Sequence, residues 1–124
     1  MTQANTDRRA AWEAYASIWK LEGAAAKKVA CARALDPDCV YRDPLMQCHG
    51  IDELVGYMVQ FHQQVPGGHF VTTKFEVHHG RSLAHWNLVA GHGTVLDTGV
   101  SYGEYGADGR PTVMTGFFEV RDPA

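Results

Sequence analysis

One carboxylate, Asp43, stands out as a candidate for chemistry. It follows the short run Cys39-Val40-Tyr41-Arg42, which predicts a strand, and it precedes Pro44, which ends that strand. A carboxylate at a strand end beside an apolar pocket is partly desolvated and held in one geometry, which suits a general acid or base. A structural role is the alternative, because Asp-Pro pairs also open turns, as we expect for Asp36-Pro37.

Two strands direct further side chains toward the same pocket. Tyr41 lies two residues before Asp43, so both side chains point to one face of their strand. In the strand predicted over 82–90, the face that carries Trp86 is the more apolar one. We therefore expect Trp86 in the pocket and His85 directed outward, toward solvent or a second subunit.

The sequence gives little support for a metal, a covalent nucleophile or a nucleotide cofactor. Seven histidines are present, but no pair has the i, i+4 spacing with an acid that zinc enzymes use. There is no G-x-S-x-G elbow, and Gly67-Gly68 precedes a strand, whereas phosphate-binding loops precede a helix. We therefore expect no metal and no cofactor, and a proton relay through His62 or His69 at the pocket rim stays open.

Length and composition are those of one globular domain. The chain has 124 residues, 45% of them hydrophobic and 20% charged, with a net charge of −3 and no basic stripe, so we expect no nucleic-acid partner. No apolar run is long enough to span a membrane, and residues 1–7 lack the pattern of a secretion signal, so a cytoplasmic location is expected. The three cysteines, Cys31, Cys39 and Cys48, are predicted to be small buried apolar residues.

Apolar spacing and turn residues predict helices first and strands afterwards. Helices are expected over 7–21, over 24–35 and from Gly50 to the break at Pro66-Gly67-Gly68, with a loop over 43–49 before the third helix. Strands joined by short turns are expected near 69–79, 82–90, 94–105 and 111–120. This order is typical of an α+β domain in which helices lie across one curved antiparallel sheet, an arrangement that encloses a pocket.

Several motifs occur in an order that resembles a known family. They are Tyr41-Arg42-Asp43-Pro44, Gly50-Ile51-Asp52-Glu53-Leu54, Pro66-Gly67-Gly68-His69-Phe70, Trp86, Asp108-Gly109-Arg110 and Gly116-Phe117-Phe118. The chain resembles the nuclear transport factor 2-like superfamily, specifically its SnoaL-like branch related to ketosteroid isomerase, over roughly residues 8–120. The resemblance implies a single domain over 1–124, a cone of three helices on a strongly curved sheet, and a homodimer formed through the outer face of the sheet.

The resemblance also implies roles for individual residues. Asp43 occupies the position of the general base in ketosteroid isomerase-like proteins, whereas the tyrosine and aspartate that bind the substrate oxygen there fall on Trp19 and Ser101 here. Steroid isomerisation is therefore not expected. Tyr41 also matches the epoxide hydrolase-like branch, but His85 and Asn87 stand where those enzymes carry a charged pair, so epoxide hydrolysis is not supported.

Two interpretations follow for the function. In the first, the chain is a cofactor-independent isomerase, cyclase or dehydratase that acts on a small hydrophobic carbonyl compound, with Asp43 as acid or base and Tyr15, Trp19 and Ser101 as candidates to polarise the substrate oxygen. In the second, the same fold is a binding or dimerisation module without turnover. The residues expected to bind the small molecule are Trp19, Tyr41, Tyr57, Phe61, Trp86, Met114 and Phe118.

Overall fold

The structure is a computed structural model that describes residues 3–120. Its helices are α1 (Gln3–Ala16), the 3-10 helix η1 (Ser17–Lys20), α2 (Ala24–Ala34) and α3 (Gly50–Gln64). Its strands are β1 (Val40–Asp43), β2 (Met46–His49), β3 (His69–His78), β4 (Arg81–Val89), β5 (Val95–Tyr105) and β6 (Pro111–Phe117). The predicted α+β class is confirmed.

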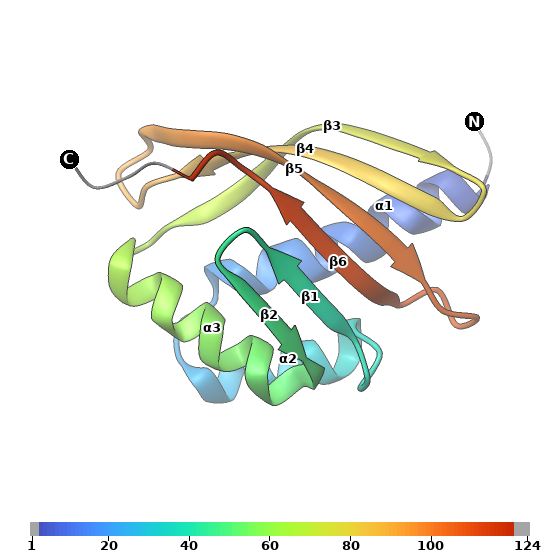
Figure 1. The fold of residues 1–124 in the computed structure, drawn as a ribbon, viewed down its shortest axis with the longest axis horizontal. Helices are drawn as coiled ribbons and strands as arrows, with labels where there is room; N and C mark the ends of the chain where they lie inside the picture. Colours follow the sequence, from blue (N-terminus) through green and yellow to red (C-terminus); the bar gives the residue numbers. More distant parts are fainter. Residues whose placement is uncertain (1–2, 121–124) are drawn as a thin grey trace.

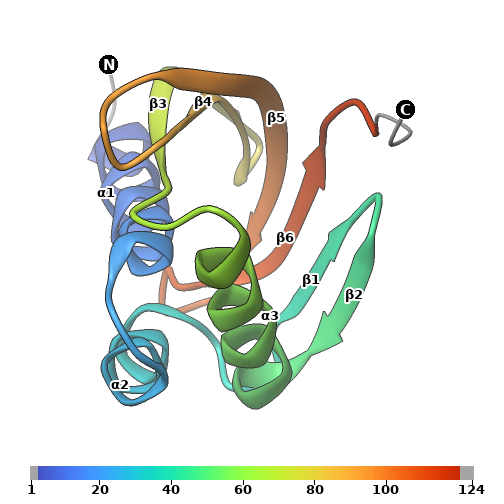
Figure 2. The ribbon, with the colours of Figure 1, turned by 90° about the vertical axis from the view of Figure 1, so that its left-hand side faces the viewer.

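The strands form one mixed sheet in the order β2-β1-β6-β5-β4-β3. Neighbouring strands are antiparallel except for β1 and β6, which run parallel, with Tyr41 opposite Met114. Register shifts interrupt the pairing of β3 with β4, of β4 with β5 and of β5 with β6, and such bulges bend strands and increase their twist. The sheet therefore curves around the helices, with β3, β4 and β5 over α1 and with β1 and β2 beside α3 (Figures 1 and 2).

The helix predicted over 7–21 differs from the observed one at both ends, because α1 begins at Gln3 and ends at Ala16. The α-helix ends at Ala16 and continues as η1, whose carbonyl groups are bound by a lysine from the next helix. The Lys27 ammonium donates hydrogen bonds to the carbonyl oxygens of Ile18, Trp19 and Leu21. Lys27 is fully buried, and this burial lowers the pKa of its ammonium group. The tight turn is therefore stabilised by a contact that local sequence does not show.

The loop predicted over 43–49 contains a strand. Residues Met46–His49 form β2, which pairs with β1 in a hairpin, with Asp43 opposite Met46. The hairpin turn is stabilised by Asp43 itself, because its Oδ1 accepts the backbone N–H groups of Leu45 and Met46 at 2.8 and 2.9 Å. The prediction that Asp43 ends its strand is confirmed.

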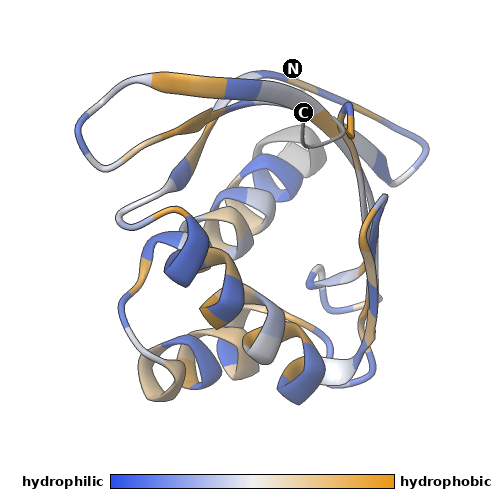
Figure 3. Ribbon diagram, turned by 60° about the vertical axis from the view of Figure 1, so that its left-hand side comes forward, coloured by the Kyte–Doolittle hydropathy of each residue, from blue (hydrophilic) through white to orange (hydrophobic). Residues whose placement is uncertain are grey.

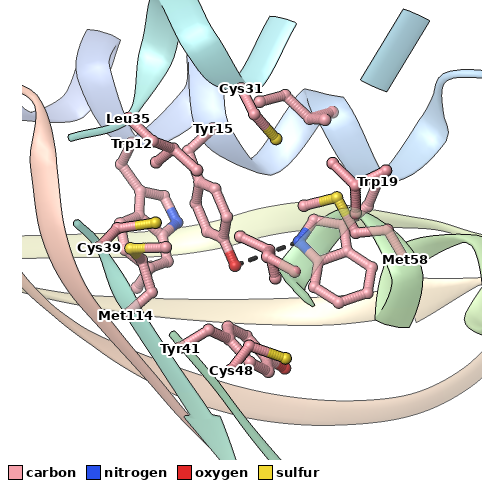
Figure 4. Packing of buried hydrophobic residues seen from close by; sticks show 14 residues of the cluster. Trp12, Tyr15, Trp19, Cys31, Leu35, Cys39, Tyr41, Cys48, Met58 and Met114 are labelled. Atoms are coloured by element: carbon pink, nitrogen blue, oxygen red, sulfur yellow. Dashed lines mark hydrogen bonds between the residues drawn. The ribbon is translucent and has the colours of Figure 1, made fainter. Parts of the chain in front are cut away.

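The core lies between the concave face of the sheet and the helices. Apolar and polar residues are interleaved along the helices and strands, as an element with one buried face requires (Figure 3). All three cysteines are buried and free, as predicted, and they lie among the core residues of Figure 4. Among residues 3–120, none of the helices has both the length and the apolar character needed to cross a bilayer.

Two tryptophan rings lie directly on the backbone of β5. The inward-facing positions of this strand include Gly99 and Gly103, and a Cβ atom at either one would meet a ring. At Gly99 the Cζ2 atom of Trp86 would be 2.4 Å away, and at Gly103 the Cζ3 atom of Trp12 would be 2.9 Å away. Glycine at these positions therefore allows two large rings to cover the sheet, and these rings form part of the cavity described next.

Candidate functional site

A cavity of about 230 Å³ lies between the concave face of the sheet and the helices α1, η1 and α3. Its volume is below the roughly 300–1,000 Å³ of pockets for drug-sized ligands, so it suits a small molecule. Nine of the ten residues predicted for the site line this cavity: Tyr15, Trp19, Tyr41, Asp43, Tyr57, Phe61, Trp86, Ser101 and Phe118.

The tenth residue, Met114, was predicted wrongly. It is 1% exposed and belongs to the core, and it is not among the residues that line the cavity. Met114 pairs with Gly103 of β5, and the ring of Trp12 lies on that glycine. Trp12 therefore closes the cavity on this side, and Met114 packs behind it.

Asp43 accepts four hydrogen bonds at the polar end of the cavity. Its Oδ2 accepts the hydroxyl groups of Tyr41 at 2.6 Å and Tyr57 at 2.8 Å, and its Oδ1 accepts the two N–H groups of the hairpin turn. All four partners are neutral donors, and a carboxylate is the form of the side chain that accepts at both oxygens. The site therefore holds an oriented anion between two phenols, one from its own strand and one from α3.

Both phenols remain protonated in this environment. Burial raises the pKa of Tyr41, and the neighbouring Asp43 raises it further. Burial and the hydrogen bond to Asp43 likewise raise the pKa of Tyr57. Each hydroxyl therefore donates to Asp43, and its oxygen is left with lone pairs that can accept a proton from another group.

Two other hydroxyl groups line the cavity, and each accepts a hydrogen bond from an indole. Trp19 Nε1 donates to Tyr15 Oη at 3.1 Å (Figure 4), and Trp86 Nε1 donates to Ser101 Oγ at 3.0 Å. Burial is the main cause that raises the pKa of Tyr15, so its phenol keeps its proton. In the described part of the chain, neither hydroxyl hydrogen has an acceptor, so both groups are available as donors to a ligand oxygen.

Glycine at position 116 separates Ser101 from Asp43. Ser101 pairs with Gly116 across β5 and β6, and Gly116 in turn lies beside the end of β1. A Cβ atom at Gly116 would be 3.5 Å from Ser101 Oγ and 3.7 Å from Asp43 Cβ. The three residues therefore form a row on the concave face, in which the missing side chain leaves space between a hydroxyl donor and a carboxylate.

The remaining wall is a continuous series of aromatic rings. The ring of Trp19 contacts those of Tyr41, Tyr57, Phe61 and Phe70, with centroid distances of 5.4–6.0 Å. The series continues from Phe70 to Trp86 at 5.0 Å and from Trp86 to Phe118 at 6.4 Å. These rings come from η1, both ends of the sheet and α3, so they fix the width of the cavity.

Sequence reasoning missed several lining residues. The most notable is Asp97, a second carboxylate, which lies on β5 four residues before Ser101 and whose Oδ1 accepts the N–H of Thr98 at 2.8 Å. Its alternation with Gly99 and Ser101 was the available signal, because residues two apart share a face of a strand. The other missed residues are Trp12, Ala16, Leu45, Gln60, Gln64, Val65, Phe70, Thr72, Leu88 and Gly116.

The histidines lie outside this site. His62 lies between Lys27 Nζ, at 3.4 Å, and the carbonyl oxygen of Gly68, at 3.2 Å, and neither His62 nor His69 lines the cavity, so the relay through them is not supported. His85 contacts Glu76 at 3.1 Å, while its neighbour Trp86 lines the cavity, which confirms the predicted orientation of this strand. Within residues 3–120, no three His, Cys, Asp or Glu side chains are grouped so that they could hold a metal ion.

Solved structures share this fold at low sequence identity. A proposed isomerase of the SnoaL-like family from Agrobacterium tumefaciens str. C58 is 22% identical, with a TM-score of 0.84, over 93% of this chain and 99% of that one. A proposed SnoaL-like polyketide cyclase from Jannaschia sp. CCS1 is 14% identical, with a TM-score of 0.76, over 96% and 90% of the two chains. An epoxide hydrolase similar to limonene epoxide hydrolase (LEH-like) from M. tuberculosis is 19% identical, with a TM-score of 0.70, over 93% and 84%.

At this level of identity the structural similarity establishes the fold, which is that of the nuclear transport factor 2-like and ketosteroid isomerase-like proteins. No curated protein sequence matches the chain significantly. A sequence model of the SnoaL-like domain matches residues 12–123, which is nearly the whole chain. The cavity, the curved sheet and the motif order agree with that match, and the chain belongs to the SnoaL-like domain family.

Proposed function

We propose that this chain is a cofactor-independent enzyme that acts by proton transfer on a small hydrophobic carbonyl compound, as an isomerase, cyclase or dehydratase does. One observation carries the proposal: the Asp43 carboxylate and the Tyr15 and Ser101 hydroxyl donors line the same small cavity. A base on one side and oxygen-directed donors on the other are the two elements that enolate chemistry requires. We also expect a homodimer formed through the outer face of the sheet and a cytoplasmic location, as the family resemblance and the sequence predict.

The hydrogen bonds around Asp43 suggest how the proton would move. The Oδ2 atom already accepts hydrogen bonds from the Tyr41 and Tyr57 hydroxyls, so a proton reaches this oxygen most directly from one of those phenols. In the proposed step, the substrate C–H bond breaks and its proton goes to Tyr57 Oη, while the Tyr57 proton goes to Asp43 Oδ2. The carbon electron pair becomes an enolate, and return of a proton at a second carbon restores the site.

The enolate oxygen would be stabilised by the two hydroxyl donors. Trp19 and Trp86 each donate to one of these hydroxyls, which orients Tyr15 Oη–H and Ser101 Oγ–H away from the indoles and strengthens them as donors. In the described part of the chain, neither hydroxyl donates a hydrogen bond that would have to break before it binds a ligand. Both donors are therefore preorganised for a charge that develops on the substrate oxygen.

A binding module without turnover is the second candidate. It is favoured by the same four hydrogen bonds, because they satisfy the Asp43 carboxylate fully without a ligand. In that case Asp43 would act as a fixed element of the hairpin and of the cavity wall, and a small molecule would bind without exchange of its protons.

Exchange of substrate protons in heavy water distinguishes these candidates. Small enones and cyclic ketones are incubated with the protein in D2O, and loss of their C–H signals is followed by proton NMR. We expect accelerated exchange by the wild-type protein, a rate about 10²–10⁴-fold lower for Asp43→Asn, and no change for Asp38→Asn, an exposed aspartate outside the cavity. If added ligands change the NMR chemical shifts but exchange no protons, the binding module is favoured. If the ligands cause no chemical-shift change and no exchange occurs, both candidates are contradicted.

A further inference from the structure

The Asp43 carboxylate brings a negative charge to the cavity. Among residues 3–120, those that line the cavity include no lysine, arginine or histidine. The nearby buried cation, Lys27, donates to the carbonyl groups of η1 and is not part of the lining. Asp43 is held by neutral hydroxyl and amide donors, which orient its charge without cancelling it. The space next to Asp43 is therefore more favourable for a cation than for an anion.

The aromatic wall adds to this preference. The ring series from Tyr41 through Trp19 and Phe70 to Trp86 surrounds the space next to Asp43. Aromatic faces carry partial negative charge, and they attract cations within about 6 Å of the ring centre, most strongly when the cation is shielded from water. Alkylated ammonium groups suit such walls, because their methyl groups need no hydrogen-bond acceptors. A primary ammonium would need three acceptors in a cavity that is mostly apolar.

Building on the proposed function, we infer that the substrates are small carbonyl compounds that carry an alkylated ammonium group. The ammonium charge would lie near the Asp43 carboxylate and the ring faces, and the carbonyl oxygen would accept from Ser101 and Tyr15. A positive charge beside the reacting carbon also favours loss of its proton, because it stabilises the enolate electrostatically. The ligand class and the proposed chemistry therefore agree, and neutral ketones would react by the same steps with weaker binding.

A matched pair of ketones tests the inference. Trimethylammonioacetone and methyl neopentyl ketone have nearly the same shape, because a quaternary carbon in the second replaces the nitrogen of the first. Binding is measured by titration calorimetry and by tryptophan fluorescence, since Trp19 and Trp86 line the cavity. We expect the cationic ketone to bind at least about tenfold more tightly than the neutral one.

Two variants identify the origin of this preference. Asp43→Asn should reduce the ratio of the two affinities to within about threefold, whereas Asp38→Asn should preserve it. Phe70→Leu keeps an apolar side chain and removes one ring, so it should weaken binding of the cationic ketone more than binding of the neutral ketone. Circular dichroism and urea unfolding confirm that each variant is folded before its affinities are compared.

The outcomes separate this inference from the proposed function. Equal or tighter binding of the neutral ketone, or an unchanged preference in Asp43→Asn, would overturn the cationic ligand class. Proton exchange on neutral ketones would then still support the proposed function. Conversely, tighter binding of the cationic ketone without any proton exchange would support a cationic ligand and contradict the proposed enzymatic function.

Discussion

Replacing Gly116 with alanine should impair function without destabilising the fold. The new methyl group would be 3.5 Å from Ser101 Oγ, 3.7 Å from Asp43 Cβ and 3.9 Å from the Arg42 carbonyl oxygen, which are ordinary van der Waals distances. The φ angle of Gly116 is not positive, so alanine can adopt its backbone conformation without strain. Alanine also restricts the unfolded chain, so we expect the free energy of unfolding to stay the same or rise by about 0.4–1 kcal/mol.

The same methyl group would occupy the space between the hydroxyl donor and the carboxylate. A ligand that reaches both groups would meet it, and forcing an extra methyl into a filled space costs about 1–3 kcal/mol. This cost corresponds to a loss of roughly 5- to 150-fold in proton-exchange rate or ligand affinity, since each 1.36 kcal/mol is a factor of ten. Urea unfolding and the deuterium-exchange assay are measured on the same preparation.

Gly99→Ala is the contrasting variant, because it places the same methyl group on the concave face at a position without room for it. Its Cβ would be 2.4 Å from Trp86 Cζ2 and 2.7 Å from the Phe117 carbonyl oxygen, so either the ring or the strand must move. We expect this variant to lose about 1–3 kcal/mol of stability. If Gly116→Ala were fully active, the space between Ser101 and Asp43 would not be where the substrate reacts, and our account of the site would be refuted.

Three further predictions concern individual side chains. Tyr57→Phe removes one donor to Asp43 and the proposed relay, so the exchange rate should fall at least about tenfold, while urea unfolding shows a loss of only about 0.5–1.5 kcal/mol. Lys27→Ala leaves a cavity and three carbonyl groups without their donor, and it should lower the free energy of unfolding by at least about 2 kcal/mol; an unchanged urea midpoint would contradict this. Burial raises the pKa of the Cys31 and Cys39 thiols from 9.0 to about 11. As the pH rises, these thiols therefore lose their protons in the unfolded chain before they do so in the folded one. Stability should therefore be fully present below about pH 9 and fall as pH rises toward about 11, by up to about 1.4 kcal/mol per pH unit for each thiol, and a flat series of urea midpoints would disprove it.

The sequence predicted those features of the fold that depend on local spacing. The three helical segments, the four long strands and the pocket position of Trp86 all follow from apolar periodicity and turn residues. Strand β2 was missed because it has four residues and three of them are exposed, so its pattern resembles a loop. The change to η1 was missed because its cause, the Lys27 ammonium, lies in the next helix.

The site was predicted in part for the same reason. Tyr41 and Asp43 could be assigned to one face of their strand from alternation, whereas Ser101 was assigned through the family resemblance, and all three line the cavity. The second phenol on Asp43 could not be assigned as its partner, because Tyr57 comes from α3 and reaches the carboxylate only through the packing of that helix on the sheet. Met114 was placed wrongly because a ring from α1, Trp12, closes the cavity on that side.

The parallel pairing of β1 with β6 also determines when the site can assemble during folding. Asp43 belongs to β1, whose neighbours are β2 and β6, and β6 with Gly116 lies between Asp43 and Ser101 of β5. The hairpins β3–β4 and β4–β5 close short loops and can form early, whereas β1 must wait for the last strand of the chain. During synthesis, the aromatic wall of β3 and β4 would therefore exist before its carboxylate is in place. A nascent chain in which β6 has not yet left the ribosome would expose an open aromatic face. The Asp43 carboxylate would reach its place in the cavity only in the last step of folding, when β6 pairs with β1.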